Sequence, residues 1–285
     1  MSTPSDPLGA YIRTGHKLVE GWLSAGAISM ITTIDAAQKA ASLRGHVGEI
    51  GVHHGKLLIL LYLLCRPDER AIGIDLFEEQ ERNLDGSGRG DQARFRRNLE
   101  LNAPDAARVR LIAADSLRLG HADIFQAIGG PVRLFSVDGG HAAALTHHDL
   151  LTAASALCEG GVLILDDYFN EEWPGVSEGT NRFLSGTPPR PLVPFAIGGN
   201  KLLLTTSTTH ADRYVAELSK ANVAADVGRR IRVHQKTTEF FGHKVLCFHF
   251  LDLGLRHRLA RTRIWTKVRQ TSVGKRIRRI ADRVW

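Results

Sequence analysis

The feature that most constrains this 285-residue sequence is a regular alternation of short apolar runs with longer mixed stretches, which begins near residue 47. The runs are rich in Val, Ile and Leu and show no polar alternation, as strands covered on both faces do. They comprise residues 47–52, 71–77, 109–114, 132–138 and 161–167. The stretches between them are expected to be helices: 56–64, 91–101, 122–128 and 142–157. This alternation predicts an α/β fold with a Rossmann-like, doubly wound, mostly parallel sheet.

The pattern changes after the fifth run. Two further apolar segments, 195–197 and 201–206, flank Gly198-Gly199-Asn200, which is a strong hairpin signal. We therefore expect a terminal antiparallel hairpin at the end of the sheet. The chain divides into a helical N-terminal cap, a central domain and a C-terminal extension, at residues 1–44, 45–210 and 211–285.

Composition is ordinary for a folded protein, with 43% apolar and 24% charged residues. No apolar run approaches the roughly 18–20 residues of a membrane-spanning helix, and the opening residues have neither the basic start nor the apolar core of a secretory signal. The three cysteines, Cys65, Cys158 and Cys247, are far apart and odd in number, which predicts buried thiols in a reducing compartment. The expected location is the cytoplasm.

Positive charge is concentrated at the end of the chain. Residues 256–285 carry eleven Lys and Arg against one Asp, which is a net charge of +10. Because the whole chain has a net charge of +7, residues 1–255 carry −3. Apolar residues at helical spacing, with Trp265 and Trp285, predict a basic amphipathic helix that contacts a membrane surface, which would place the protein peripherally on the inner face of the membrane. The alternatives are a helix packed on its own body and a contact in a homo-oligomer. Nucleic-acid binding is not expected, because no aromatic platform accompanies the charge.

A glycine-containing loop joins the first run to the first expected helix. Glu49, Gly51 and Gly55 lie where a ligand approaches the backbone and the amides of the helix start. A dinucleotide-binding loop has a glycine in the first position. The acid at Glu49 would repel a pyrophosphate but suits the ammonium of a zwitterionic amino acid. This difference favours S-adenosyl-L-methionine over NAD as the cofactor.

Two further acids follow the next runs. Asp75 lies near the end of the second run, where a carboxylate accepts both ribose hydroxyls of a bound nucleoside. Asp115 and Ser116 follow the third run, a place suited to contact with the adenine. Each element alone is weak, but the three in order, each after its own strand, support the same cofactor.

Three aspartates close the fourth and fifth runs: Asp138, Asp166 and Asp167. Neighbouring strands lie about 4.8 Å apart, and two unit charges 4 Å apart repel by about 4 kcal/mol at an effective dielectric of 20. The cluster therefore needs a cation or a proton. Oxygen ligands favour Mg²⁺ or another hard divalent cation. The alternative is that Asp166 or Asp167 caps a helix or lies in a solvated loop.

His141 lies three residues after Asp138, at the start of an expected helix. A neutral imidazole there could accept the proton of an acceptor hydroxyl, with Asp138 and its metal as the other catalytic group. The alternative is a helix-capping or surface histidine. A polar segment with three glycines, residues 78–90, follows the ribose-binding position. It is expected to be a lid or, alternatively, a solvated loop, with Gln80, Asn83, Asp85 and Arg89 as candidate contacts.

Four motifs resemble those of the metal-dependent sugar O-methyltransferase family, which includes the macrocin and mycinamicin enzymes: G-E-I-G-V-x-x-G-K, G-I-D-L-F-E-x-Q-x-x-N-x-D-G-S-G-R-G, V-D-G-x-H, and L-D-D-Y with W-P-G-V beyond. The resemblance covers roughly residues 40–210. It implies a class I methyltransferase fold, with 45–210 as the S-adenosylmethionine-dependent methyltransferase domain, Mg²⁺ on Asp138, Asp166 and Asp167, and His141 as the base. Some members carry an acid where this chain has Gly140.

The resemblance implies methyl transfer to a hydroxyl of a sugar or glycan. A vicinal diol would chelate the metal through two oxygens, which favours such an acceptor over an amine. The alternatives are a small phenol or natural product as acceptor, and a non-catalytic scaffold that binds S-adenosylmethionine and associates with a membrane.

Overall fold

A computed structural model describes residues 6–83, 85–103, 105–221 and 231–252. The basic segment 256–285, for which a membrane-surface helix is expected, lies outside these residues. Among the helices of the described ranges, none is long and apolar enough to span a bilayer.

The described residues form one nine-stranded sheet with the strand order β3-β2-β1-β4-β5-β7-β6-β9-β8. The first five strands run parallel, and β7 is antiparallel to both β5 and β6. The bounds are β1 His46–Ile50, β2 Ala71–Asp75, β3 Val109–Ala113, β4 Val132–Val137, β5 Leu157–Asp166, β6 Val193–Gly198, β7 Lys201–Thr205, β8 Ile231–Phe240 and β9 His243–Asp252. The predicted doubly wound sheet with a terminal antiparallel hairpin is confirmed.

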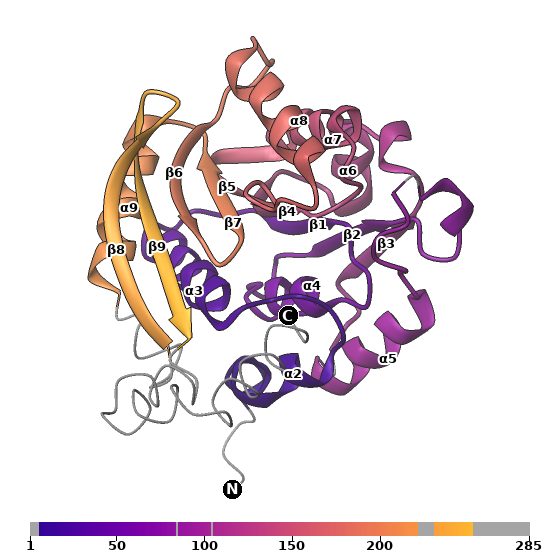
Figure 1. Cartoon of the computed structure of the whole chain (residues 1–285). Helices are drawn as coiled ribbons and strands as arrows, with labels where there is room; N and C mark the ends of the chain where they lie inside the picture. Colours follow the sequence, from indigo (N-terminus) through magenta and orange to yellow (C-terminus); the bar gives the residue numbers. More distant parts are fainter. Residues whose placement is uncertain (1–5, 84, 104, 222–230, 253–285) are drawn as a thin grey trace, which may run out of the picture.

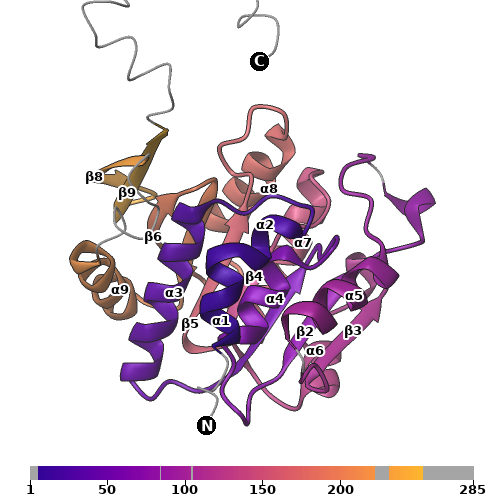
Figure 2. The same ribbon diagram turned by 90° about the horizontal axis from the view of Figure 1, so that it is seen from below.

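Helices cover both faces of the sheet (Figure 1). One face carries α3 Ala25–Ala40, α4 Lys56–Leu63, α5 Gln92–Asn102 and α9 Thr208–Lys220, which are in front in Figure 2. The other face carries α6 His121–Ile128, α7 Ala143–Ala156 and α8 Pro174–Ser185. Shorter helical segments are α1 Pro7–Ala10, η1 Tyr11–Gly15, α2 His16–Leu18, η2 Gln80–Arg82 and η3 Ser116–Arg118. The N-terminal region is thus helical, as expected, whereas α8 was not anticipated.

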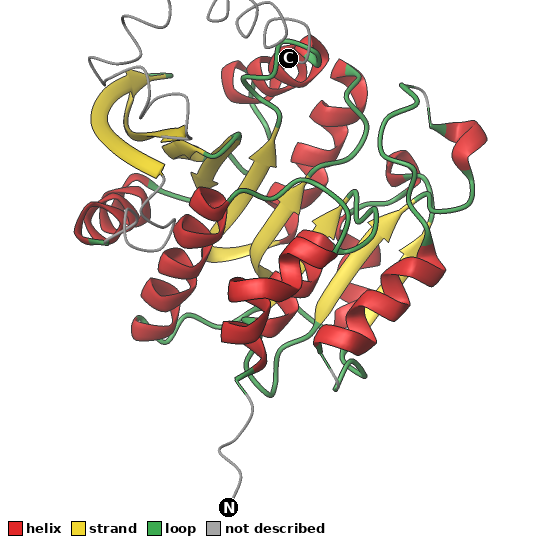
Figure 3. Cartoon of the chain, turned by 60° about the horizontal axis from the view of Figure 1, so that its bottom comes forward, coloured by secondary structure: helices red, strands yellow, loops and turns green. Residues whose placement is uncertain are grey.

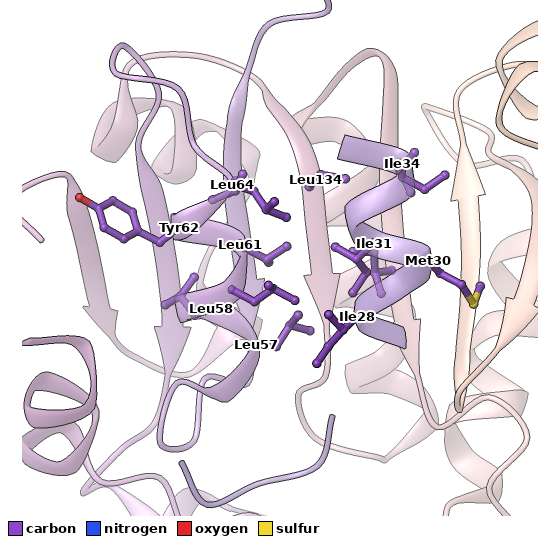
Figure 4. Packing of buried hydrophobic residues seen from close by; sticks show 14 of the residues in the cluster. Ile28, Met30, Ile31, Ile34, Leu57, Leu58, Leu61, Tyr62, Leu64 and Leu134 are labelled. Carbon is purple, nitrogen blue, oxygen red and sulfur yellow. The ribbon is translucent and has the colours of Figure 1, made fainter. Parts of the chain in front are cut away.

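The core between α3, α4 and the sheet consists mainly of Leu and Ile side chains, with Met30 and Tyr62 among them (Figure 4). Ile31 on α3 and Leu61 on α4 are almost fully buried in the same cluster as Leu134 of β4. Burial of each such side chain contributes about 1.5–3 kcal/mol. This packing holds the amino end of α4, and with it the glycine-containing loop, against the strand ends.

A buried ion-pair network joins α3 to the edge of the sheet at which the parallel strands begin. Arg133 of β4 is fully buried and pairs with Asp35 at 2.8 Å and with Glu69 at 2.9 Å. Its guanidinium also donates to the side-chain oxygen of Gln38 at 2.9 Å. These contacts fix α3 on the sheet at this edge.

The β8–β9 hairpin, assigned to the C-terminal extension, continues the same sheet (orange and yellow in Figure 1). Ala196 of β6 pairs in register with Leu246 of β9. The three cysteines are free thiols, as expected, but half-buried and not fully buried. Burial raises the pKa of Cys65 to about 12 and that of Cys158 to about 11.

Candidate active site

The acidic residues singled out in the sequence gather at one edge of the sheet. The parallel strands all end there, as the arrowheads in Figure 3 show. Glu49 lies in β1, Asp75 ends β2, and Asp138 and Asp167 directly follow β4 and β5. Ligands of doubly wound sheets bind outside this edge, so this is the candidate active site.

Glu49 is buried and only partly satisfied. Its side chain is 2% exposed, and its Oε2 atom has no hydrogen-bond partner among the described residues. Burial, and secondly the neighbouring Asp138, raise the pKa of Glu49 well above its ordinary value. A buried carboxyl oxygen without a partner is costly, and a cationic ligand group would satisfy it. This fits the ammonium of an amino-acid-containing cofactor.

Gly51 and Gly55 are each required in the loop for a different structural reason. Gly51 has φ +87°, and a Cβ there would lie 1.7 Å from the backbone oxygen of Asp138. Gly55 also has φ +87°, and a Cβ there would lie 2.3 Å from the ring of Phe95 on α5. Gly51 therefore permits the close approach of the β1 and β4 ends. Gly55 permits helix packing, where the sequence suggested room for a ligand.

Asp75 is held by backbone amides, one on each oxygen. Oδ1 accepts from the N–H of Phe77 at 2.6 Å, and Oδ2 accepts from that of His53 at 2.8 Å. Burial raises the pKa of Asp75 against the opposing effect of these hydrogen bonds. The carboxylate is therefore fixed in place at the predicted ribose position.

Asp115 caps the turn Ser116–Arg118, since its Oδ1 accepts from the N–H of Leu117 at 3.0 Å. The structure thus places Asp115 and Ser116 just beyond β3, which ends at Ala113, and shows a local structural role for the carboxylate of Asp115.

Lys201 is the residue that the sequence did not reveal. It begins β7 opposite Asp166 of β5, is 3% exposed, contacts the Asp166 carboxylate directly and lies 3.7 Å from that of Asp138. Burial opposes the charge on Lys201, but the carboxylates of Asp138 and Asp166 outweigh it and raise its pKa. The sequence signal that could have revealed Lys201 is its position directly after the Gly198-Gly199-Asn200 turn, because this turn sets the register of β7 with β5.

The expected metal ligands are brought together in part. Ligand atoms of Asp138, Asp167 and His141 lie within 4.8 Å of one another, whereas Asp166 is paired with Lys201. Asn200 donates to Asp166 at 3.0 Å and to Asp167 at 2.6 Å. Two carboxylates and an imidazole at this separation fit a divalent cation such as Mg²⁺ or Mn²⁺.

His141 is held on both ring nitrogens and on one face. Its Nδ1 lies 2.8 Å from Oδ2 of Asp85, its Nε2 lies 3.3 Å from Oδ2 of Asp167, and its ring stacks on Trp173 at 4.1 Å between centroids. Burial alone would lower the pKa of His141, but the hydrogen bonds with Asp167 and Asp85 outweigh it and raise the pKa. A carboxylate–histidine pair of this kind is the usual arrangement of a general base.

The segment 78–90 supplies this carboxylate. Asp85 also accepts from the backbone N–H of His141 at 2.7 Å, and the hydroxyl of Ser87 lies 3.1 Å from Nδ1. Burial acts to raise the pKa of Asp85, but hydrogen bonds from Ser87 and His141 lower it to about 2. Gly90 lies against the carboxylate of Asp75. The described residues of this segment therefore contact both His141 and Asp75 and are not a purely solvated loop.

Comparison with known proteins agrees with this geometry. Residues 49–168 match the model of a family described as a methyltransferase domain. The fold is that of a class I methyltransferase. No curated protein matches the sequence.

Three solved structures illustrate the likeness. The O-methyltransferase NovP is 14% identical, with a TM-score of 0.51 over 64% of this chain and 80% of NovP. CalS11, a TDP-rhamnose 3'-O-methyltransferase of calicheamicin biosynthesis, is 20% identical, with a TM-score of 0.47 over 63% and 80%. The MycE methyltransferase, solved with Mg and SAH, is 17% identical, with a TM-score of 0.46 over 72% and 56%. The likeness to NovP shows a shared fold and leaves the acceptor open.

Proposed function

We propose that this methyltransferase domain transfers the methyl group of S-adenosyl-L-methionine to a hydroxyl of a sugar or glycan, assisted by a divalent cation. The observation that carries the proposal is the juxtaposition, at one sheet edge, of the Glu49 carboxyl, whose Oε2 has no hydrogen-bond partner among the described residues, with the His141–Asp85 pair. The first fits the ammonium of the methyl donor. The second fits removal of a proton from an acceptor.

The reaction is an in-line displacement in which the acceptor oxygen attacks the methyl carbon and the carbon–sulfur bond breaks, which converts the sulfonium to a thioether. His141 takes the hydroxyl proton on Nε2, while Asp85 keeps the ring oriented through Nδ1. Asp138 and Asp167 would hold the cation, which supplies Lewis-acid polarisation of the acceptor oxygen. Orientation of the two reactants contributes about 7–11 kcal/mol in favourable cases.

A phenolic or other natural-product acceptor is a second candidate, favoured by an aromatic cluster beside Asp167. Tyr168 and Phe169 follow this aspartate, and Phe240 of the β8–β9 hairpin lies 5.4 and 6.2 Å from their rings, respectively. Phe169 is 59% exposed and Phe241 is 38% exposed. Exposed aromatic rings offer a stacking surface to a flat or apolar acceptor.

Donor binding is tested by isothermal titration with S-adenosyl-L-methionine. We expect wild-type protein to bind, and Asp75→Asn to raise the dissociation constant at least about tenfold, because two ribose hydroxyls lose a charged acceptor. Asp68→Asn, which removes an exposed carboxylate paired with Arg44, is the control and should bind like wild type. Absence of binding by wild-type protein at millimolar ligand would refute the proposed function.

The acceptor half is tested by transfer of a labelled methyl group to a panel of sugar and catechol acceptors. We expect EDTA to abolish transfer, and His141→Gln to slow it by about 100-fold or more, the usual contribution of a general base. His147→Gln, on α7, is the matched control. Transfer that survives EDTA would exclude the cation, and near-normal turnover of His141→Gln would place the base elsewhere. The preferred acceptors would distinguish a glycan enzyme from a phenol enzyme.

A further inference from the structure

Lys201 lies in the middle of the acidic cluster, and the mechanism above does not use it. β5 lies between β4 and β7 in the sheet, so the side chain that begins β7 reaches over the end of β5. Its ammonium contacts Asp166 and lies 3.7 Å from Asp138. It is therefore bound to two of the three aspartates that resemblance assigns to a metal.

The environment holds this ammonium in place. Lys201 is 3% exposed, and its nearest carboxylates are that of Asp166, in direct contact, and that of Asp138, at 3.7 Å. A buried cation with such neighbours cannot leave its carboxylates without a large desolvation cost. Asp166 is engaged on both oxygens, by Asn200 and by Lys201. It is thus the carboxylate least able to turn toward another ion.

We propose that Lys201 is a resident cation that competes with the divalent ion for Asp138 and Asp166. It withholds Asp166 and leaves Asp138 and Asp167 as the carboxylate ligands. This inference rests on the proposed function. Its consequence is weak binding of the divalent ion in the absence of acceptor, because a fixed positive charge stands beside the site and repels it.

The test is Mn²⁺ binding, measured by titration calorimetry and by the electron paramagnetic resonance signal of free Mn²⁺, without methyl donor or acceptor. We expect Lys201→Met to bind Mn²⁺ at least tenfold more tightly than wild type. Lys39→Met is the matched control, since it removes a lysine paired with Asp35 on α3 at 2.7 Å, near the opposite edge. Its Mn²⁺ affinity should stay within twofold of wild type.

A second pair of variants covers the case in which Lys201→Met does not fold. Asp166→Asn keeps the lysine, and Asp166→Asn/Lys201→Met removes both members of the buried pair together. The double variant should bind Mn²⁺ at least tenfold more tightly than Asp166→Asn. Folding is checked by circular dichroism and thermal melting.

Equal or weaker Mn²⁺ binding after loss of Lys201 in either comparison would overturn the inference, as would a failure of every variant to bind. Binding that appears only when Lys201 is removed would support it. S-adenosyl-L-methionine titration of wild-type protein is run in parallel. Absence of donor binding by wild-type protein would refute the proposed function, and the Mn²⁺ comparison could still be interpreted by itself.

Discussion

Replacement of Arg133 by methionine is expected to lower the free energy of unfolding by about 3–5 kcal/mol. The guanidinium is fully buried, pairs with Asp35 and Glu69, and donates to the backbone oxygen of Leu64 at 3.0 Å. Its loss leaves two buried carboxylates without their cation. Because Asp35 lies on α3, the helix that packs beside α4 should also detach more readily from the sheet.

Equilibrium unfolding in urea, followed by circular dichroism, measures this loss. The matched control is Arg44→Met, because Arg44 pairs with Asp68 at 3.2 Å while both side chains are more than half exposed. An exposed pair contributes about 0–1 kcal/mol. Similar losses in the two variants would mean that the buried network contributes no more than a surface pair.

The second large effect is expected from Gly51→Ala. An added Cβ would lie 1.7 Å from the backbone oxygen of Asp138, and the N–H of Asp138 already donates to Ile50 at 2.8 Å. The ends of β1 and β4 must therefore separate, which moves Glu49 away from Asp138. Since a displacement of about 1 Å can cost 100-fold in rate, we expect methyl transfer to fall by about that factor. The dissociation constant for S-adenosyl-L-methionine should rise more than about tenfold, which corresponds to 1.4 kcal/mol.

Gly86→Ala is the control that distinguishes the steric overlap caused by Gly51→Ala from the backbone strain that both variants share. Gly86 has φ +68°, and its added Cβ would meet no atom within 4 Å. Both variants carry the left-handed penalty of roughly 1–2 kcal/mol, but only Gly51→Ala carries the overlap. Donor binding is measured by calorimetry and transfer with labelled donor. If the two variants lose donor affinity equally, the close approach of β1 and β4 is not what the donor site needs.

The fold was largely predictable because its signals are local. The apolar runs correspond to β1–β5, and Gly198-Gly199-Asn200 indicated the β6–β7 hairpin, with Gly199 and Asn200 both at positive φ. The helix α8 was not expected, because its apolar residues are few and Pro174 at its start resembles a loop signal. Addition of β9 and β8 to the same sheet depends on pairing between β6 and β9, which local periodicity does not encode.

In the candidate site, residue types and chain order determined which acids stand at the strand ends, because parallel strands place Glu49, Asp75, Asp138 and Asp167 at one edge. Their partners were decided by the tertiary structure alone. Asp85 reaches His141 across 56 residues, and Lys201 reaches Asp166 across 35. Such pairs depend on the path of a loop and on strand register, so a local sequence motif does not specify them. The sequence thus determined the fold and the acids at its strand ends, and tertiary packing decided how the cluster around His141 and Asp166 is charged and held.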